Sequence, residues 1–164
     1  MPKRDFLSLS DFSREELDAL LLRAIELKEE RSSNVIHNSL AGKTGILILA
    51  QNSTRTRIAF EAGMNQLGGH SIFLSDRDSQ ASRGEPLEDF ARVVSEMADV
   101  VMTRQPEQKR IELLAKHASI PVINGMSSDL HPCQLLADMQ TFLELKGSIE
   151  GRSVAFIGDG FNMC

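Results

Sequence analysis

Hydrophobic and polar positions alternate along the chain with two different periods. Five segments have apolar residues every three or four positions, which predicts helices at 13–31, 55–67, 86–97, 107–118 and 132–145. Four short apolar runs lie between them and are typical of buried parallel strands: 45–50, 71–74, 100–103 and 121–124. This order predicts an α/β fold, an open parallel sheet with helices on both faces.

A fifth apolar run, residues 153–157, follows a turn region at 147–151 and predicts one more buried strand. Only seven residues follow this run, whereas a parallel strand requires helices to cover its faces. We therefore expect residues 1–150 to form one domain and residues 151–164 to begin a second, represented here by its first strand.

Composition narrows the class of protein. The chain has 164 residues, of which 41% are hydrophobic and 25% charged, so it can bury a core. Its net charge of −5 and its scattered Lys and Arg residues argue against a nucleic-acid partner. The sequence has neither an apolar run of membrane-spanning length nor an N-terminal signal core, which predicts a cytoplasmic protein without a membrane partner.

Two nucleotide-binding patterns occur only in part. Gly42-Lys43-Thr44 resembles the end of a P-loop, but the first glycine of that motif would fall at His37, and the lysine precedes a strand instead of following it. Gly158-Asp159-Gly160 follows an apolar run, but the third glycine of a dinucleotide fingerprint would fall at Met163. We expect no nucleotide cofactor.

Metal and disulfide chemistry are also disfavoured. Cys133 and Cys164 lack the spacing of a disulfide framework, so reduced thiols are expected. His131 and Cys133 are near neighbours, but no second cluster of ligands supports a metal site. Cys133 is expected to be an ordinary buried residue of a helix.

The segment Ser53-Thr54-Arg55-Thr56-Arg57 joins a predicted strand to a predicted helix. Three hydroxyls, up to two guanidinium groups and the first backbone N–H groups of the helix can converge there on a phosphate. Ordinary capping and solvated arginines are the alternative. Cations oppose the helix dipole at this end unless an anion is present, which favours anion binding.

Three further polar side chains follow two other predicted strands. Arg104 follows one strand, and His131 and Gln134 follow another. Taken singly, they could be a surface cation, a loop histidine and an exposed amide. Since carboxyl ends of parallel strands share one crevice, we expect them to join the first loop in a site for a molecule with a phosphate and a polarisable carbonyl.

Five ordered motifs resemble the aspartate/ornithine carbamoyltransferase family, and most closely its ornithine branch. They are Ser-Thr-Arg-Thr-Arg at 53–57, Ser-Arg-Gly-Glu-Pro at 82–86, Pro-Val-Ile-Asn-Gly at 121–125, His-Pro-Cys-Gln at 131–134 and Ile-Gly-Asp-Gly at 157–160. The resemblance extends from about residue 5 to the end. It implies a Rossmann-like carbamoyl-phosphate-binding domain plus the first strand of the amino-acid-binding domain.

The resemblance also implies roles for individual residues. Arg104 would contact both the phosphate and the carbonyl oxygen, His131 would donate to that oxygen, and Gln134 would hold the carbamoyl amino group. Arg57 would be structural. The phosphate itself would be held by the first four residues of the motif: Ser53, Thr54, Arg55 and Thr56.

Two further implied contacts concern the acceptor and a neighbouring subunit. Gln80, in the polar loop 75–84, would complete the phosphate site of the next subunit, which implies a homotrimer with shared active sites. Asn162 would contact ornithine. The catalytic residues implied are Arg55, Arg104 and His131, with no metal and no cofactor.

The activity implied is carbamoyl transfer from carbamoyl phosphate to the side-chain amine of ornithine, giving citrulline and phosphate in arginine biosynthesis. Aspartate, putrescine or acetylornithine could instead be the acceptor, and a non-catalytic phosphate-binding chain is a further alternative.

The family's usual Phe-Glu-Lys before the serine is replaced here by Leu49-Ala50-Gln51, its leucine after Asn-Gly by Met126, and its Asn-Asn pair by Phe161-Asn162. We expect altered donor affinity and no complete turnover by these 164 residues alone.

Overall fold

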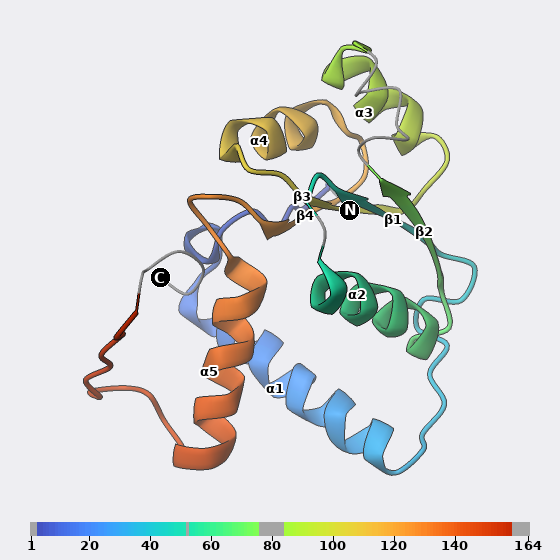
Figure 1. Cartoon of the computed structure of the whole chain (residues 1–164). Coiled ribbons are helices and arrows are strands. Elements are labelled where there is room, and N and C mark those ends of the chain that lie inside the picture. The colour runs from blue at the N-terminus through green and yellow to red at the C-terminus, as the bar shows by residue number, and fades with distance from the viewer. Residues whose placement is uncertain (1–2, 52, 76–83, 159–164) are drawn as a thin grey trace.

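Four parallel strands form the centre of the molecule. The structure is a computed structural model and describes residues 3–51, 53–75 and 84–158. In space the strands follow the order β2-β1-β3-β4 (Figure 1). Their bounds are β1 Thr44–Leu49, β2 His70–Ser75, β3 Val100–Arg104 and β4 Val122–Met126. All four strands expected between the helices are therefore confirmed.

Helices cover both faces of this sheet (Figure 1). A 3₁₀ turn, η1 (Leu9–Asp11), precedes five α-helices: α1 Arg14–Ser32, α2 Thr54–Gln66, α3 Leu87–Ser95, α4 Gln108–His117 and α5 Pro132–Lys146. The helices α3 and α4 lie on one face and α2 and α5 on the other, with α1 packed against α5. The predicted α/β class is confirmed. None of the described helices has both the length and the apolar character needed to cross a membrane.

The core has two halves because side chains of a strand alternate between the faces of the sheet. Ile46 and Ile48 of β1 pack toward α3 and α4, where Phe90 is also buried. Leu47 and Leu49 point the other way, into a cluster that includes Met102 and Phe60 of α2. The strand β1 is thus buried on both faces, as expected for the interior of a parallel sheet.

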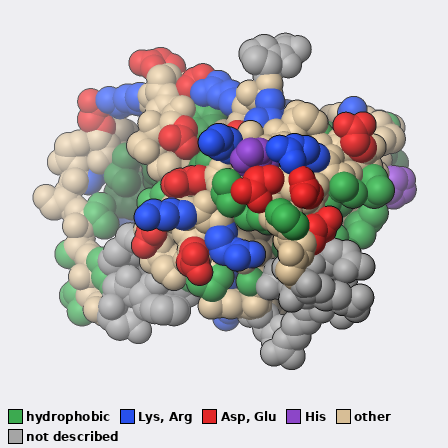
Figure 2. Space-filling view, turned by 90° about the horizontal axis from the view of Figure 1, so that it is seen from above, with side chains coloured by type: hydrophobic (Ala, Val, Ile, Leu, Met, Phe, Trp, Pro, Cys, Tyr) green, Lys and Arg blue, Asp and Glu red, His purple; other side chains and the backbone are tan. Residues whose placement is uncertain are grey.

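On the face covered by α3 and α4, positive and negative side chains are interspersed (Figure 2). Arg92 pairs with Asp89 within α3 at 2.7 Å between Nη1 and Oδ1. The Arg92 Nη2 atom also lies 3.5 Å from Nδ1 of His117 on α4. Arg92 therefore has neighbouring partners on both α3 and α4.

The chain near its N-terminus lies along the outer edge of β4, which the sequence pattern did not predict. The backbone N–H of Phe6 donates to the carbonyl of Val122 at 2.8 Å, and the N–H of Asn124 donates to the carbonyl of Phe6 at 2.8 Å. The Asp5 carboxylate accepts from the N–H of Val122 at 2.8 Å. Residues 5–7, called the N-terminal strap below, thereby cover an edge that would otherwise expose unpaired backbone groups.

The strand predicted at 153–157 is wrong for this structure. These residues have no regular structure, and Val154 and Ile157 are 71% and 96% exposed. A strand forms only when a neighbour accepts and donates its ladder hydrogen bonds. The segment runs away from the sheet beyond α5 (Figure 1) and pairs with none of the four described strands.

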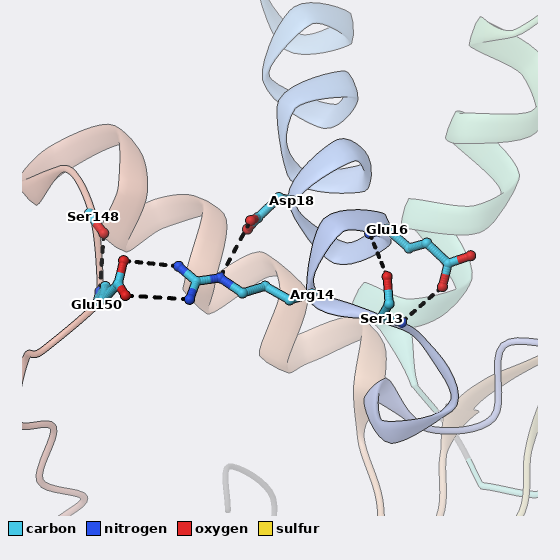
Figure 3. Close-up of polar contacts among 6 residues, drawn as sticks. All are labelled: Ser13, Arg14, Glu16, Asp18, Ser148 and Glu150. Carbon is cyan, nitrogen blue, oxygen red and sulfur yellow. Dashed lines mark hydrogen bonds and ion pairs between the residues drawn. The ribbon is translucent and has the colours of Figure 1, made fainter.

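Polar contacts attach the turn before this segment to α1 (Figure 3). Arg14 Nη2 lies 3.0 Å from Glu150 Oε2, and the N–H of Glu150 donates to the Ser148 hydroxyl at 3.1 Å. A capping box begins α1, with reciprocal hydrogen bonds between Ser13 and Glu16. These contacts fix where the chain leaves α5.

A bulge ends the pairing of β3 with β4. Thr103 is opposite Asn124, whereas Arg104 is opposite Met126, so Gly125 is the additional residue. A Cβ atom at Gly125 would lie 2.4 Å from the Met102 sulfur and 3.2 Å from the Thr103 carbonyl oxygen. Glycine therefore permits the close approach of the two strands at the carboxyl edge of the sheet.

We expect Gly125→Ala to lower the free energy of unfolding by about 1–3 kcal/mol, because the methyl group overpacks this contact. Gly63→Ala is the matched control, since a Cβ there meets nothing within 4 Å inside α2. It should stabilise the protein by about 0.5–1 kcal/mol through helix propensity. Urea unfolding followed by circular dichroism measures both changes, and equal midpoints for the two variants would contradict the expectation.

Candidate functional site

Arg104 and the loop before α2 lie at the carboxyl edge of the sheet. Leu49, the last residue of β1, is opposite Arg104, the last residue of β3. The backbone pairing extends one residue further, since the N–H of Ala50 donates to the Arg104 carbonyl at 3.0 Å. The loop that leads to α2 therefore starts beside Arg104, as the strand order requires.

A small hydrogen-bonded cluster joins Arg104 to the start of α2. Ser53 caps this helix: its hydroxyl accepts from the N–H of Thr56 at 3.4 Å and donates to the Thr56 hydroxyl at 2.8 Å. Arg104 Nη1 donates to the hydroxyls of Ser53 and Thr56 at 3.3 and 3.2 Å. The other N–H groups of the first turn have no acceptor within the helix and remain available to an anion.

The Arg104 guanidinium has little to balance its charge. Burial lowers its pKa, and its Nε atom is buried without a hydrogen-bond partner. Within the described parts of the chain, no ion pair joins it to a carboxylate. Arg104 is half-buried, and a partly desolvated cation that contacts only hydroxyls is favourable when an anion completes its coordination.

The two arginines of α2 differ in their surroundings. Arg57 Nε lies 2.9 Å from Glu61 Oε1, and its guanidinium stacks 3.8 Å from the centre of the Phe73 ring. Arg57 is thus occupied within the fold. Arg55, one residue into the helix after Thr54, is exposed to solvent, as is Thr54. Both can reach a ligand at the end of the helix.

His131 is half-buried at the N-cap of α5, directly before the buried Pro132. Burial lowers its pKa, the positive charge of Arg104 lowers it further, and Asp138 opposes both effects. The His131 Nδ1 atom is buried without a hydrogen-bond partner. A neutral imidazole close to the Arg104 charge can donate one hydrogen bond to a ligand oxygen.

The structure does not bring every expected site residue into contact with the cluster. The Gln134 side chain donates to the Asp138 carboxylate at 2.9 Å on the surface of α5. Gln80 and Asn162 lie outside the described residues. The groups in direct mutual contact are those of Ser53, Thr56 and Arg104.

Two hollows adjoin the cluster and reveal neighbours that the sequence argument did not single out. A groove of about 320 Å³ is lined by Gln51, Ser53, Thr54 and Phe73, among others. A pocket of about 20 Å³ is lined by Gln51, Arg104 and Ser127, among others. Gln51, two residues before Ser53, borders both hollows and belongs to the 49–51 departure from the family motif described above. Phe73 and Ser127 are the neighbours that no sequence motif indicated.

Cys133 is a structural residue, as expected. Its thiol lies 3.4 Å from the carbonyl oxygen of Asn124, to which it donates. Burial raises its pKa to about 11. The described residues contain no group of three or more His, Cys, Asp or Glu side chains that could hold a metal ion.

Residues 4–144 match the family of the aspartate/ornithine carbamoyltransferase carbamoyl-P binding domain. The chain belongs to this carbamoyltransferase family. Its relatives include the ornithine carbamoyltransferases of Hydrogenovibrio crunogenus and Acinetobacter baumannii, which are 55% and 54% identical over all 164 residues. The chain spans about half the length of these relatives, 54% in each case.

Solved carbamoyltransferase structures share the fold. The ornithine carbamoyltransferase of Burkholderia thailandensis superimposes with a TM-score of 0.93 at 45% identity, covering 98% of this chain and 55% of that protein. The Thermus thermophilus ornithine carbamoyltransferase gives 0.90 at 36% identity over 99% of this chain and 55% of that protein. An aspartate transcarbamoylase of Trypanosoma cruzi gives 0.85 at 29% identity, covering 92% and 47%.

His131 should titrate below the ordinary histidine pKa of 6.5 in a ring-proton NMR titration. Asp138→Asn should lower its pKa further, because the carboxylate is the group that raises it. The unfolded chain takes up a proton at 6.5 and the folded chain only at lower pH, so this residue lowers stability as pH falls through 6.5. A His131 midpoint above 6.5 would contradict the burial argument.

Cys133 should resist alkylation while the chain is folded. With a pKa of about 11, its thiol is ionised in about one molecule per thousand at pH 8. Iodoacetamide followed by peptide mass mapping should leave Cys133 unlabelled in buffer and label it fully in concentrated urea. Rapid labelling under native conditions would mean that the first turn of α5 opens to solvent.

Proposed function

We propose that this chain is the donor-binding half of an ornithine carbamoyltransferase, which transfers the carbamoyl group of carbamoyl phosphate to ornithine. The observation that carries the proposal is the incompletely paired Arg104 guanidinium, hydrogen-bonded to the two hydroxyls at the start of α2. Such an arrangement suits a phosphate dianion. The carbamoyltransferase names of relatives aligned over the whole chain support the same reading.

The phosphate end of carbamoyl phosphate would bind at the start of α2. The hydroxyls of Ser53 and Thr56 and the free N–H groups of the first turn would donate to its oxygens, with Thr54 and Arg55 closing the site from the solvent side. Arg104 would contact both the phosphate and the carbonyl oxygen. The anion would then supply negative charge opposite the start of α2, Arg55 and Arg104.

The reaction needs stabilisation of charge at the carbonyl. The uncharged amine of the acceptor attacks the carbonyl carbon, so a C–N bond forms and the carbonyl oxygen becomes an oxyanion. The oxyanion collapses, the C–O bond to phosphate breaks, and phosphate leaves with the electron pair and the proton lost by nitrogen. Hydrogen bonds from Arg104 and His131 would stabilise the oxyanion, at about 3–4 kcal/mol for one well-placed donor.

The remaining parts of the assignment follow the motif resemblance. Residues 1–150 would form the donor-binding domain, and residues 151–164 would begin the amino-acid-binding domain, where Asn162 contacts ornithine. Gln134 would hold the carbamoyl amino group after leaving Asp138. Gln80 would complete the phosphate site of a neighbouring subunit in a cytoplasmic homotrimer, acting in arginine biosynthesis.

A second candidate function is phosphate or carbamoyl-phosphate binding without catalysis. Gln51 favours it, because this neutral side chain borders both hollows of the site where the family usually has a lysine. Loss of that charge would weaken attraction of the donor and stabilisation of the leaving phosphate. Binding of the donor by the chain, with no turnover when the acceptor domain is supplied, would support this candidate.

Calorimetric titration with the non-hydrolysable phosphonate analogue of carbamoyl phosphate tests the donor site. The wild-type chain should bind one equivalent, and Arg55→Gln and Arg104→Gln should each weaken binding by about tenfold or more, because each removes a charged contact to phosphate. Arg57→Gln is the matched control from the same helical turn. It should bind within about threefold of wild type, since Arg57 is held by Glu61 and Phe73.

Circular dichroism establishes that each variant is folded before it is titrated. A folded wild-type chain that does not bind the analogue would contradict the donor-site assignment. Equal losses for the three arginine variants would mean that general positive charge, and not the Arg104 cluster, attracts the ligand.

A further inference from the structure

Asn124 is a completely buried polar residue, 0% exposed, in β4 at the carboxyl edge of the sheet. Its Nδ2 atom donates to the Leu7 carbonyl at 3.0 Å and to Gln108 Oε1 at 3.1 Å. Its backbone N–H donates to Phe6, and its carbonyl accepts from the Cys133 thiol. One residue thereby contacts the N-terminal strap, the first residue of α4 and the first turn of α5.

These contacts join the two faces of the sheet. The Asn124 side chain lies on the same face as Val122, two residues earlier, which packs in the core beneath α3 and α4. Cys133 belongs to α5, which lies on the opposite face (Figure 1). The Oδ1 atom of Asn124 is buried without a hydrogen-bond partner, so the amide depends on its two Nδ2 bonds. Breaking them would leave buried polar groups unpaired, which is strongly unfavourable, and they therefore hold the strap, α4 and β4 in one mutual arrangement.

Two short connections link Asn124 to the candidate site. In one direction along the chain, Asn124 is followed by the Gly125 bulge and by Met126, which is opposite Arg104. In the other, the Cys133 thiol ties the first turn of α5 to the Asn124 carbonyl. That turn carries His131 at its cap and Gln134.

We propose that Asn124 is a positioning residue that sets the first turn of α5, with His131 and Gln134, against Arg104. The proposal rests on the proposed function, in which those two side chains contact the carbamoyl group. Asn124 lines neither hollow of the site. In this proposal it nevertheless aligns the groups that bind the carbamoyl end of the ligand with those that bind the phosphate end.

The phosphate end of the site is held by hydrogen bonds that do not involve Asn124. Ser53, Thr56 and Arg104 are joined by hydrogen bonds to one another, and none of these bonds involves Asn124. Substitution of Asn124 by alanine removes its two Nδ2 hydrogen bonds, to Leu7 and Gln108, and retains its backbone contacts to Phe6 and Cys133. Loss of the two side-chain bonds should therefore loosen β4 and displace the carbamoyl end of the site attached to it, while leaving the phosphate end in place. General loss of structure would impair both ends together, which separates the two explanations.

The test compares two ligands on the same chain: inorganic phosphate and the phosphonate analogue of carbamoyl phosphate, each titrated by calorimetry. Asn124→Ala should weaken binding of the analogue by about tenfold and that of phosphate by less than about twofold. Val94→Ala, which trims a buried side chain of α3 and removes none of these hydrogen bonds, is the control for lost stability. It should leave the ratio of the two affinities unchanged.

Should Asn124→Ala not fold, Gln108→Leu gives the same comparison, because it removes one of the Asn124 contacts and retains the others. The affinity for the phosphonate analogue should then fall about threefold. Equal weakening of both ligands, or an unchanged ratio in the variant that folds, overturns the proposal.

Absence of analogue binding by the wild-type chain would count against the proposed function and not against Asn124. In that case the ring signals of His131 decide. The proposal is supported if Asn124→Ala, or Gln108→Leu where that variant replaces it, shifts these NMR signals and Val94→Ala does not. Unchanged signals refute it.

Discussion

The positive charge of Arg104 is held at the end of a central strand, partly out of water and against two neutral hydroxyls. Taking a guanidinium out of water is unfavourable unless charge or good hydrogen bonds replace the lost hydration. Hydroxyl partners replace only part of it, and the buried Nε atom has none. The fold keeps this arrangement because the strand that carries Arg104 is fixed by pairing on both sides. Backbone hydrogen bonds made elsewhere therefore hold Arg104 in the position that the proposed anion site requires.

The pairing also determines which loops surround the anion. The N–H of Ala50 bonds to the Arg104 carbonyl, and that of Gln105 bonds to the Met126 carbonyl at 3.2 Å. The parallel ladder thus continues for a residue beyond the strands. As a result the loop to α2 and the segment that leads to α5 start on either side of Arg104. Ends of parallel strands meet at one edge of any such sheet, and this extension places the loop to α2 and the segment that leads to α5 beside Arg104, as the proposed donor site requires.

Much of this arrangement could be predicted from local sequence. The apolar periods gave five helices and four strands, and the motif at 53–57 gave a helix cap with hydroxyls because capping depends on neighbours in the chain. Predictions failed where a partner distant in sequence decides the outcome. Residues 153–157 have the composition of a strand but no strand beside them, and the strap 5–7 forms because β4 has a free edge. Periodicity contains no information about either pairing.

The same limit applied to side chains. The hydrophobic pattern alone does not distinguish Arg55 from Arg57, and the partners Glu61 and Phe73, the second of them on β2, are what occupy the Arg57 guanidinium. Gln134 was expected at the ligand but bonds to Asp138, one turn along its own helix. The motif indicates which groups are present, whereas the tertiary contacts determine which of them are free.

In the proposed reaction, electrostatic coupling between Arg104 and His131 would link donor binding to the chemical step. In the absence of an anion, the Arg104 charge and burial both lower the pKa of His131, which keeps the imidazole neutral. An anion bound to Arg104 offsets that charge, and negative charge near an imidazole favours its protonated form. The pKa of His131 should therefore rise as the donor binds, and rise again as the carbonyl oxygen becomes negative. In this proposal, hydrogen bonding from His131 would be strongest at the stage where charge develops on the carbonyl oxygen, and such a difference between stages is what accelerates a reaction.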